Sequence, residues 1–427
     1  MSEDIVEGVS SFYERARVWA AANLRPLDSQ QLEIAFRTDL SEREELADVV
    51  RERELQKFYF DAGFAGICVP PEYGGQGLTP SHQSALNQAL AGREYPSRFQ
   101  APTFAPCLAV LLEFGTKEQK RRHVPAMLKG EELWMQLLSE PGGGSDVAGA
   151  MTNAERDGDQ WTLNGSKIWT TGAWWSDWGL CLARTNWDVP KHRGLTVFIL
   201  PLRQPGIEIQ RIEMLNGSME FCQEFMSDVF VPDSDRIGSV DDGWTVGVRW
   251  MFHERMLYNS PLVTFPVGAR YTTTSSSLIN LARDVGRIDE PGVRELIGEA
   301  HMLDLVGDTL QERIGKAVRT GLVSDQAAAV PRLFKGVAGA RGRTIAFEIA
   351  GAAGAAWTET DGAAVDRGIE FLMRQTGCIG GGTTEMARNV ISERLLGMPR
   401  EPAFDREVPF RDVPRGPSSK PPTRPRA

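Results

Sequence analysis

The chain has 427 residues and a formal net charge of -10, which argues against nucleic acid as a partner. This length is enough for two or three domains. The five cysteines and five histidines are scattered, with no Cys-x-x-Cys and no metal-ligand spacing, so the sequence predicts neither a disulfide framework nor a metal site.

The N-terminus, Met1-Ser2-Glu3-Asp4, is acidic and is not followed by an apolar core. We therefore expect no signal or transit peptide. No apolar run approaches membrane-spanning length. The sequence predicts a cytoplasmic protein with reduced thiols and no membrane partner.

Residues 1–132 are predicted to form an N-terminal helical domain. Apolar residues near the start of the chain recur at helical spacing, at Ile5, Val9, Phe12, Ala16 and Trp19. From residue 133 the pattern changes to short apolar or alternating runs separated by turn residues, which are typical of strands. These runs cover residues 133–138, 195–200, 207–210 and 225–232.

The first strand leads into a glycine-rich loop, Ser139 to Gly149, with the sequence Ser-Glu-Pro-Gly-Gly-Gly-Ser-Asp-Val-Ala-Gly. Three consecutive glycines let a backbone turn sharply and approach a ligand closely. The hydroxyls of Ser139 and Ser145 and free N–H groups can then bind an anion or the polar edge of a ring. An ordinary surface turn is the alternative, since neither a dinucleotide fingerprint nor a Walker sequence is present.

A β-hairpin is predicted over residues 161–171, with Asn164-Gly165 as a type I′ turn. In its return strand, Trp169 and Thr171 are expected to point to the same face. A flat aromatic ring beside a hydroxyl suits one edge of a flat heterocycle.

Helical periodicity returns from residue 241, where Leu296, Leu303, Val306 and Leu310 share one face. One carboxylate in this region stands out. Glu254 has Trp250, Met251, Leu257 and Tyr258 at offsets of three and four residues, which would place it on an apolar helix face. Burial there would raise its pKa towards that of a useful base, although a buried ion pair that holds the helices together is the alternative.

A second glycine-rich segment, Cys378 to Glu385, runs into an amphipathic helix with Thr383 or Thr384 as its cap. The electropositive end of that helix offers free N–H groups. From about residue 401 the chain becomes rich in proline, arginine and serine, and residues 401–427 are predicted to form a disordered tail.

Together, Ser139–Gly149, Trp169-Thr170-Thr171 and the second glycine segment resemble motifs of the acyl-CoA dehydrogenase family. Four further segments match the family in order, which makes the set specific: residues 63–77, 115–120, 190–194 and 242–244. The resemblance implies an α+β multidomain fold. It would have an N-terminal helical domain (1–132), a middle β-barrel (133–240), and a C-terminal four-helix bundle (241–400).

The resemblance also implies an FAD enzyme that introduces an α,β double bond into an acyl-CoA thioester. A base removes the α-proton, and the β-hydrogen leaves as hydride to the flavin. The flavin contacts would be Gln136, Leu138, Ser139, Gly144, Ser145, Trp169, Thr171, Thr383 and Glu385. The substrate contacts would be Ser145, Arg255 and Gly380.

The chain departs from the family pattern at the catalytic loop. In many members a glutamate stands where this chain has Gly381, which keeps only its backbone N–H as a donor to the thioester oxygen. Some members instead carry the base in a Glu-Arg pair on another helix, which implies Glu254 as the base beside Arg255. Glu385 is the rival carboxylate, although its position favours a flavin or subunit contact.

A further departure concerns the adenosine half of the flavin site. The usual Arg-x-x-Phe-Gly motif is missing from residues 275–293, and Glu348 replaces the glutamine of another family loop. This half-site is either rebuilt or supplied by a different subunit. The expected partners are an electron-transferring flavoprotein and either identical subunits (dimer or tetramer) or a related subunit (heterotetramer). A non-catalytic half-site subunit and a flavin monooxygenase or oxidase remain the alternatives.

Overall fold

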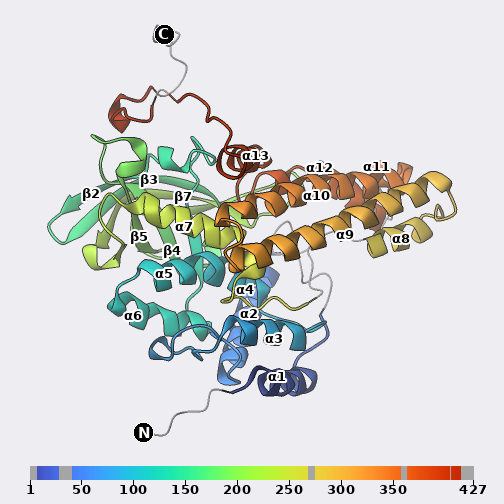
Figure 1. Ribbon diagram of the computed structural model, residues 1–427. Coiled ribbons are helices and arrows are strands. Elements are labelled where there is room, and N and C mark those ends of the chain that lie inside the picture. The colour runs from blue at the N-terminus through green and yellow to red at the C-terminus, as the bar shows by residue number, and fades with distance from the viewer. Residues whose placement is uncertain (1–6, 28–40, 268–274, 357–362, 404, 415–427) are drawn as a thin grey trace.

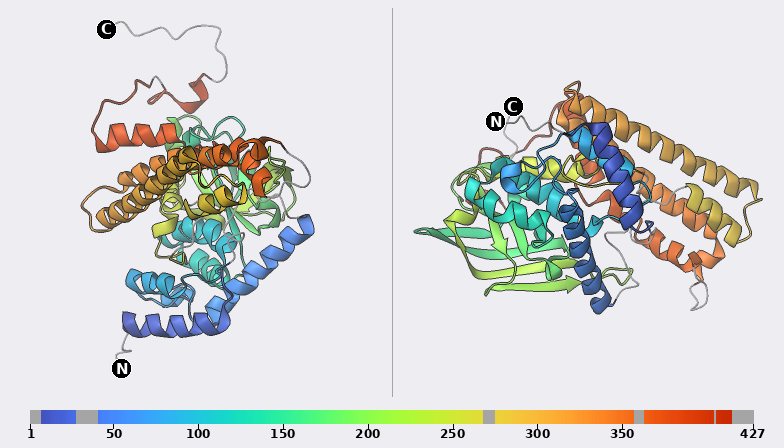
Figure 2. Two further views of the ribbon diagram at one scale, coloured as in Figure 1. Left: turned by 90° about the vertical axis from the view of Figure 1, so that its right-hand side faces the viewer. Right: turned by 90° about the horizontal axis from the view of Figure 1, so that it is seen from below.

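The computed structural model describes residues 7–27, 41–267, 275–356, 363–403 and 405–414. Helices, then strands, then helices follow one another along the chain, as predicted. The N-terminal helices lie below the sheet, and the C-terminal helices project away from it as an arm (Figure 1). Figure 2 shows the same division from two further sides.

The N-terminal domain begins with α1 (Val9–Asn23), in which Phe12 and Ala16 are buried as predicted. Of the other predicted positions, Trp19 is half-buried, whereas Val9 is exposed. The prediction for Ile5 falls outside the described residues. A capping box at Ser41 starts α2 (Glu42–Asp61). The remaining α-helices of this domain are α3 (Pro80–Ala89), α4 (Ser97–Pro102), α5 (Ala109–Phe114) and α6 (Lys117–Leu128).

The middle domain is a mixed eight-stranded sheet in which β6, β7, β3, β2, β4, β5 and β8 follow one another and β1 pairs with β4. Its strands are β1 (Trp134–Leu137), β2 (Asn153–Asp157), β3 (Gln160–Thr171), β4 (Trp178–Arg184), β5 (Leu195–Pro201), β6 (Ile207–Ile212), β7 (Phe221–Pro232) and β8 (Arg236–Ile237). The predicted middle β-domain is confirmed, but its described strands do not close into a barrel. The edge strand β8 has only two residues and pairs with β5 alone, so nothing joins it to β6.

The predicted turn at Asn164-Gly165 is wrong. Strand β3 runs straight through both residues, because the long strand β7 pairs with it on either side of a bulge between Leu163 and Gly165. The Asn164 side chain donates to Asp228 Oδ1 on β7 (3.1 Å), and the Asp228 N–H donates back to Asn164 Oδ1 (2.8 Å). The hairpin turn lies earlier, between β2 and β3, where Gly158 has a left-handed φ of 59°.

The C-terminal region consists of α7 (Gly243–Arg255), α8 (Ser275–Asp284), α9 (Pro291–Arg319), α10 (Ala329–Ala350), α11 (Ala352–Ala355), α12 (Ala363–Leu372) and α13 (Thr384–Val390). The predicted helical bundle is confirmed, with a core that joins α8, α9 and α10. Helix α7 lies against the sheet (Figure 1). It packs into the large core that the N-terminal helices share with β1, β4 and β5.

The expected disorder of residues 401–427 is not what the structure shows for residues 405–414. These residues return to the β-domain, where Phe410 is only 4% exposed. The high content of proline and arginine predicted that this segment could not bury enough apolar surface to be ordered. Burial of the single aromatic side chain of Phe410 against the β-domain nevertheless holds residues 405–414 in place. Residues 415–427 lie outside the described residues.

Candidate active site

The glycine-rich loop after β1 is anchored at its base by Glu140. The carboxylate of Glu140 accepts from the N–H groups of Met151 (2.6 Å) and Thr152 (3.0 Å), and from Lys167 Nζ (2.8 Å). Burial alone would raise the pKa of Glu140, but the charge and hydrogen bond of the buried Lys167 hold it below its usual value. The loop ends are therefore fixed, while Gly143 in the middle stays exposed and open to a ligand.

The predicted flavin contacts at the start of this loop lie beside β3. The carbonyl of Ser139 accepts from Ile168 N (3.0 Å), and the carbonyl of Leu138 accepts from Lys167 Nζ (3.2 Å). The Ser139 hydroxyl faces Gly144, where an added Cβ would lie 3.3 Å from Ser139 Oγ. Ser145 is exposed. The loop and the end of β3 thus form one surface.

Trp169 occupies a bulge rather than a regular strand position. Its φ is 67°, and the pairing of β3 with β7 shifts between Ile168 and Thr170. The bulge turns Thr170 into the interior, while Trp169 stays 51% exposed and Thr171 is half-buried. The expectation of a regular strand was wrong here, but the result is an indole presented to solvent, as a flat ligand requires.

Gln136 joins β1 to the helix that carries Glu254. Its Oε1 accepts from Trp250 Nε1 (2.6 Å), and its backbone carbonyl accepts from Thr170 Oγ1 (3.3 Å). Trp250 is fully buried and lies one turn before Glu254 on α7. Besides the predicted flavin contact, Gln136 therefore has a structural role, because this hydrogen bond connects β1 to α7.

Glu254 lies at the last turn of α7, which ends at Arg255. The predicted apolar face is therefore right for Trp250 but wrong for Leu257, which belongs to the following 3-10 turn, as does the backbone of Tyr258. The Glu254 carboxylate forms no hydrogen bond or ion pair with any described residue. Burial raises its pKa, and the charges of Arg255 and Arg332 partly oppose that rise.

The second glycine segment lies directly against Glu254. A Cβ added at Gly381 would stand 3.9 Å from Glu254 Oε1, and one at Gly382 would stand 3.4 Å from Arg255 Nη2. Both glycines have left-handed backbones, with φ of 69° and 90°. The Gly381 N–H donates to no described residue. The Gly381 N–H and the half-buried Glu254 carboxylate thus lie close to each other.

Arg332, on α10, is a site residue that sequence reasoning missed. Its Nη2 donates to the carbonyl of Gly380 (2.5 Å). Burial lowers the pKa of the Arg332 guanidinium, and the negative charge of Glu254 partly opposes this shift. No spacing signal could have found it, because 78 positions of chain separate residues 254 and 332 and only the bundle brings them together. It holds the glycine segment in place and adds positive charge near Glu254.

Thr383 and Glu385 begin α13. The Thr383 hydroxyl caps the helix by accepting from Met386 N (3.1 Å), as predicted. The Glu385 side chain is exposed, and its own backbone N–H and the hydroxyl of Thr384 hold its pKa below the usual value. A carboxylate in that state is a poor candidate for the base. Its predicted flavin or subunit contact stays a prediction.

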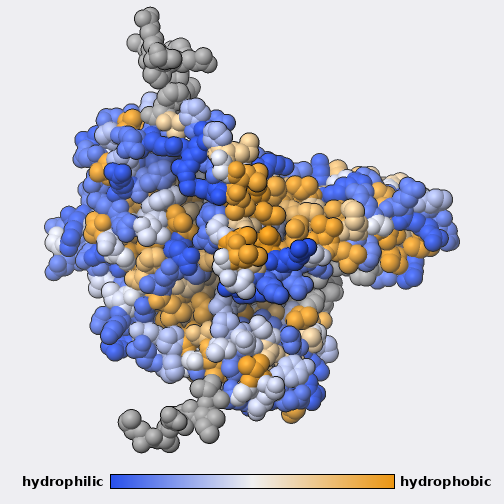
Figure 3. All heavy atoms as spheres, viewed as in Figure 1, coloured by the Kyte–Doolittle hydropathy of each residue, from blue (hydrophilic) through white to orange (hydrophobic). Residues whose placement is uncertain are grey.

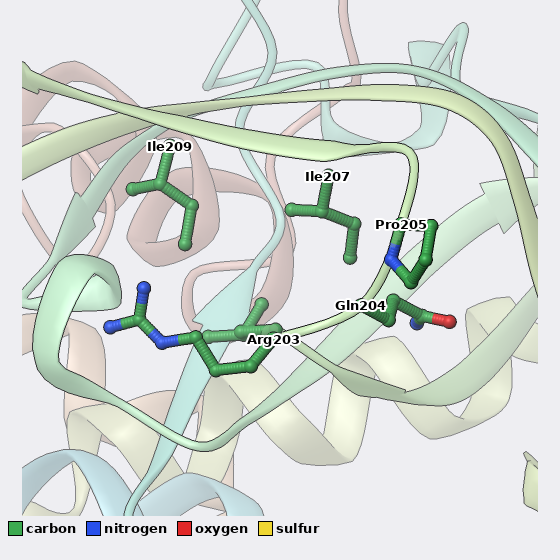
Figure 4. A pocket seen from close by; sticks show the side chains of 6 residues that line it. Arg203, Gln204, Pro205, Ile207 and Ile209 are labelled. Atoms are coloured by element: carbon green, nitrogen blue, oxygen red, sulfur yellow. The ribbon is translucent and has the colours of Figure 1, made fainter.

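A separate pocket lies at the turn between β5 and β6 (Figure 4). It is lined by Leu202, Arg203, Gln204, Pro205, Ile207 and Ile209. Arg203 extends along this pocket and donates to the carbonyl of Trp174. None of the predicted site residues lines it, so it belongs to the surface of the sheet rather than to the candidate active site.

This combination of a helical domain, a middle sheet and a helical bundle, with the two glycine segments at their junction, defines the acyl-CoA dehydrogenase fold. Comparison with known families agrees. Residues 29–131 match the model of the acyl-CoA dehydrogenase N-terminal domain, and residues 136–229 match that of the middle domain. The chain belongs to the acyl-CoA dehydrogenase family, and is therefore an oxidoreductase.

Two relatives illustrate how close the similarity is. The chain is 33% identical to the acyl-CoA dehydrogenase IpdE1 of Mycobacterium tuberculosis over 80% of this chain and 86% of that protein. It is 34% identical to the acyl-CoA dehydrogenase FadE34 of the same organism, over 82% of this chain but only 47% of that relative, so the chain spans about half its length.

Solved structures agree with the fold. The Tcur3481-Tcur3483 steroid acyl-CoA dehydrogenase superposes with a TM-score of 0.70 at 27% identity, covering 92% of this chain and 98% of that one. One chain of the ChsE4-ChsE5 complex from Mycobacterium tuberculosis superposes with a TM-score of 0.67 at 24% identity, covering 94% and 100%. No helix within the described ranges is long and apolar enough to cross a membrane.

Proposed function

We propose that this chain catalyses the FAD-dependent α,β-dehydrogenation of an acyl-CoA thioester to the trans-2-enoyl-CoA, with Glu254 as the base. The observation that carries the proposal is the state of the Glu254 carboxylate. It is half-buried, has no hydrogen-bond or ion-pair partner among the described residues, and lies beside Gly381. A structural ion pair would instead show a partner within bonding distance.

The two sides of this space have complementary tasks. An α-proton is too weakly acidic for an ordinary carboxylate, so the base needs a raised pKa and the enolate oxygen needs donors. At Glu254, burial supplies the raised pKa. The Gly381 N–H supplies a donor for the thioester oxygen. We assign Arg255, whose guanidinium lies beside Gly382, to the CoA end of the substrate.

The residues of the glycine-rich loop and β3 fit FAD. The indole of Trp169 is exposed for stacking, the middle glycines carry no side chain that would obstruct a ring, and Ser139 and Thr171 offer hydroxyls at the edge. We assign Gln136, Leu138, Gly144, Ser145, Thr383 and Glu385 as further contacts. When bound, the flavin would accept the β-hydrogen as hydride.

Anaerobic mixing of purified protein with a panel of acyl-CoAs tests the proposal, because bleaching of the oxidised flavin reports both the substrate and the reaction. Glu254→Gln should slow bleaching by about 10²–10⁴-fold, the usual contribution of a positioned base. Glu385→Gln, the matched control, should bleach at the parent rate. Equal rates for the parent and Glu254→Gln would remove Glu254 from the mechanism.

A half-site in a larger assembly is the second candidate function. The Arg-x-x-Phe-Gly motif for the adenosine half of FAD is missing from residues 275–293, and Glu348 replaces a glutamine of another family loop. Two of the similar solved structures are described as pairs of different subunits. We propose that a second chain of this family covers α9 and α10 and completes the site, and that an electron-transferring flavoprotein accepts the electrons. A chain that binds FAD only after co-expression with a related subunit would support the heteromer.

An oxidase or monooxygenase is a further alternative, since similar folds at 21% and 20% identity include the prolyl acyl carrier protein oxidase AnaB and the FAD complex of PigA. These likenesses support the fold alone. Stopped-flow reoxidation distinguishes the chemistry. A dehydrogenase reduced by substrate should react slowly with oxygen and rapidly with an electron-transferring flavoprotein, whereas rapid peroxide formation would indicate the oxidase.

A further inference from the structure

The C-terminal segment, residues 405–413, packs on the β-domain far from the helix α13 that precedes it (Figure 1). Its backbone is bonded in place: Phe410 N donates to the carbonyl of Val189 (2.9 Å), and Arg411 N donates to that of Trp187 (3.0 Å). The family resemblance assigned this segment no role.

Phe410 covers the cation that holds the end of the flavin loop. The guanidinium of Arg184 lies 3.8 Å from the centre of the Phe410 ring and is fully buried. The same guanidinium donates to the carbonyls of Ala148 (2.6 Å), near the end of the glycine-rich loop, and Ala150 (3.3 Å), directly after it. Trp187 also stacks against the Phe410 ring, with ring centroids 5.5 Å apart. Removing Phe410 would expose Arg184 to water and weaken its hold on the loop.

Lys191 makes a second connection between the two segments. Its ammonium lies 2.9 Å from Asp405 Oδ2 on the C-terminal segment and 3.0 Å from Asp146 Oδ2 on the flavin loop. The Lys191 side chain is only 15% exposed. Asp146 directly follows Ser145, a predicted flavin and substrate contact. The C-terminal segment therefore contacts both cations that bind the second half of the loop.

We infer that the C-terminal segment is a brace that positions the flavin-binding loop, through Phe410 on Arg184 and Asp405 on Lys191. A run of three glycines loses much conformational entropy when it is ordered, and its own side chains contribute no packing in return. Contacts that hold the second half of the loop before the cofactor arrives reduce the entropy lost on binding. The inference rests on the proposed function only for the identity of the ligand that the loop receives.

Hydrogen exchange in flavin-free protein tests the brace without using the cofactor. Amides in a peptide spanning residues 141–151 should exchange about tenfold faster in Phe410→Ala and in Asp405→Asn than in the parent, because the loop opens more often. Glu407→Ala, an exposed change on the same segment, should leave exchange unchanged. In a Lys191→Met background, Asp405→Asn should have no further effect. Parent-like exchange in both Phe410→Ala and Asp405→Asn would overturn the brace.

FAD titration separates this inference from the proposed function. Dissociation constants for FAD should rise about tenfold in Phe410→Ala, which corresponds to about 1.4 kcal/mol. If Phe410→Ala does not fold, Asp405→Asn still tests the brace, because it changes only one half-exposed carboxylate and should remain folded. A parent protein that binds no FAD would contradict the proposed function, while the exchange data would still decide on the brace. Unchanged affinity in both variants, with normal binding in the parent, would overturn the brace alone.

Discussion

At the scale of single residues, we expect Arg332 to affect how readily Glu254, the proposed base, accepts a proton. The charged groups that face Glu254 among the described residues are Arg255 and Arg332, and each favours the ionised carboxylate against burial. Arg332→Gln removes one of these charges, so the pKa of Glu254 should rise further. Because a base must be deprotonated, the low-pH limb of the bleaching rate should move to higher pH.

A pH profile of the bleaching rate checks this prediction, with Arg332→Lys as the control that keeps the charge. The lysine variant should have the parent profile. A profile in Arg332→Gln that coincides with the parent would mean that Arg332 acts only through its hydrogen bond to Gly380, as a holder of the glycine segment.

Glu224 provides a second residue-scale prediction, concerning stability. It is fully buried on β7, with one oxygen unpartnered among described residues and the other accepting from Thr170 Oγ1 (3.0 Å). Burial raises its pKa to about 8 from an ordinary value of 4.5. Between these values the folded state keeps a proton that the unfolded chain releases, so stability falls as pH rises through this window.

The neutral analogue Glu224→Gln should abolish this slope. Thermal unfolding of the variant and the parent should give similar melting temperatures at pH 5 and a higher one for the variant at pH 8. Glu155→Gln, an exposed change on β2, serves as the control and should follow the parent at both values. Other titrating groups affect the parent and the variant alike, so the difference between their melting temperatures isolates Glu224. If this difference were the same at pH 5 and pH 8, the proposal that Glu224 is buried in its neutral form would be contradicted.

At the scale of elements, the contact between β1 and α7 positions the proposed base, Glu254, relative to the proposed flavin-binding loop and β3. Gln136→Leu would leave the indole N–H of the fully buried Trp250 without its partner, which costs about 1–3 kcal/mol of stability. We expect a lower free energy of unfolding and a slower bleaching rate, because α7 carries Glu254. Gln136→Glu keeps an acceptor and should restore stability. Denaturant unfolding of both variants checks this, and loss of FAD affinity without loss of stability would indicate a flavin contact instead.

Elements also show how far local sequence signals carry. Helical spacing correctly predicted α1, and alternating runs predicted β5, β6 and β7. The prediction of a turn at Asn164-Gly165 failed because strand pairing competes with the local preference for a turn. Strand β7 provides 12 residues that can pair with β3. The side chain of Asn164 also forms its hydrogen bond with Asp228 while the chain stays extended. The Asp-Gly pair at residues 157–158, with no such partner strand across it, is the turn instead.

At the scale of the whole molecule, the sequence predicted the order of domains and the loops that carry chemistry, since motifs and periodicity are local. It did not predict contacts made by distant segments. Arg332 reaches Gly380 across the bundle, and Phe410 reaches Arg184 across the β-domain. Such contacts depend on three-dimensional packing, and a lone arginine or phenylalanine has no periodic pattern to mark it.

The C-terminal arm provides the prediction for the assembled protein. Figure 3 shows apolar residues gathered over the C-terminal helices on one face of the molecule. On α9, Met302, Leu305 and Val306 share a face and are 40–54% exposed, and on α10 Val337 is 49% exposed. An apolar face of this kind typically marks a surface that another protein covers. We expect a second chain of the same family to bury it.

Leu305→Asp should therefore reduce assembly, because an unpaired carboxylate in an apolar interface is costly. Light scattering after gel filtration should shift from the oligomer towards the monomer, for the chain alone if the subunits are identical or for the co-expressed pair if they differ. Leu215→Asp, at an exposed leucine on the β-domain, is the matched control and should leave the mass unchanged. If assembly is required to complete the FAD site, Leu305→Asp should also lose FAD in proportion to the monomer formed. If the oligomer forms normally with Leu305→Asp, the interface lies elsewhere. If the parent stays monomeric both alone and with the related subunit, the prediction that a second chain covers this face is contradicted.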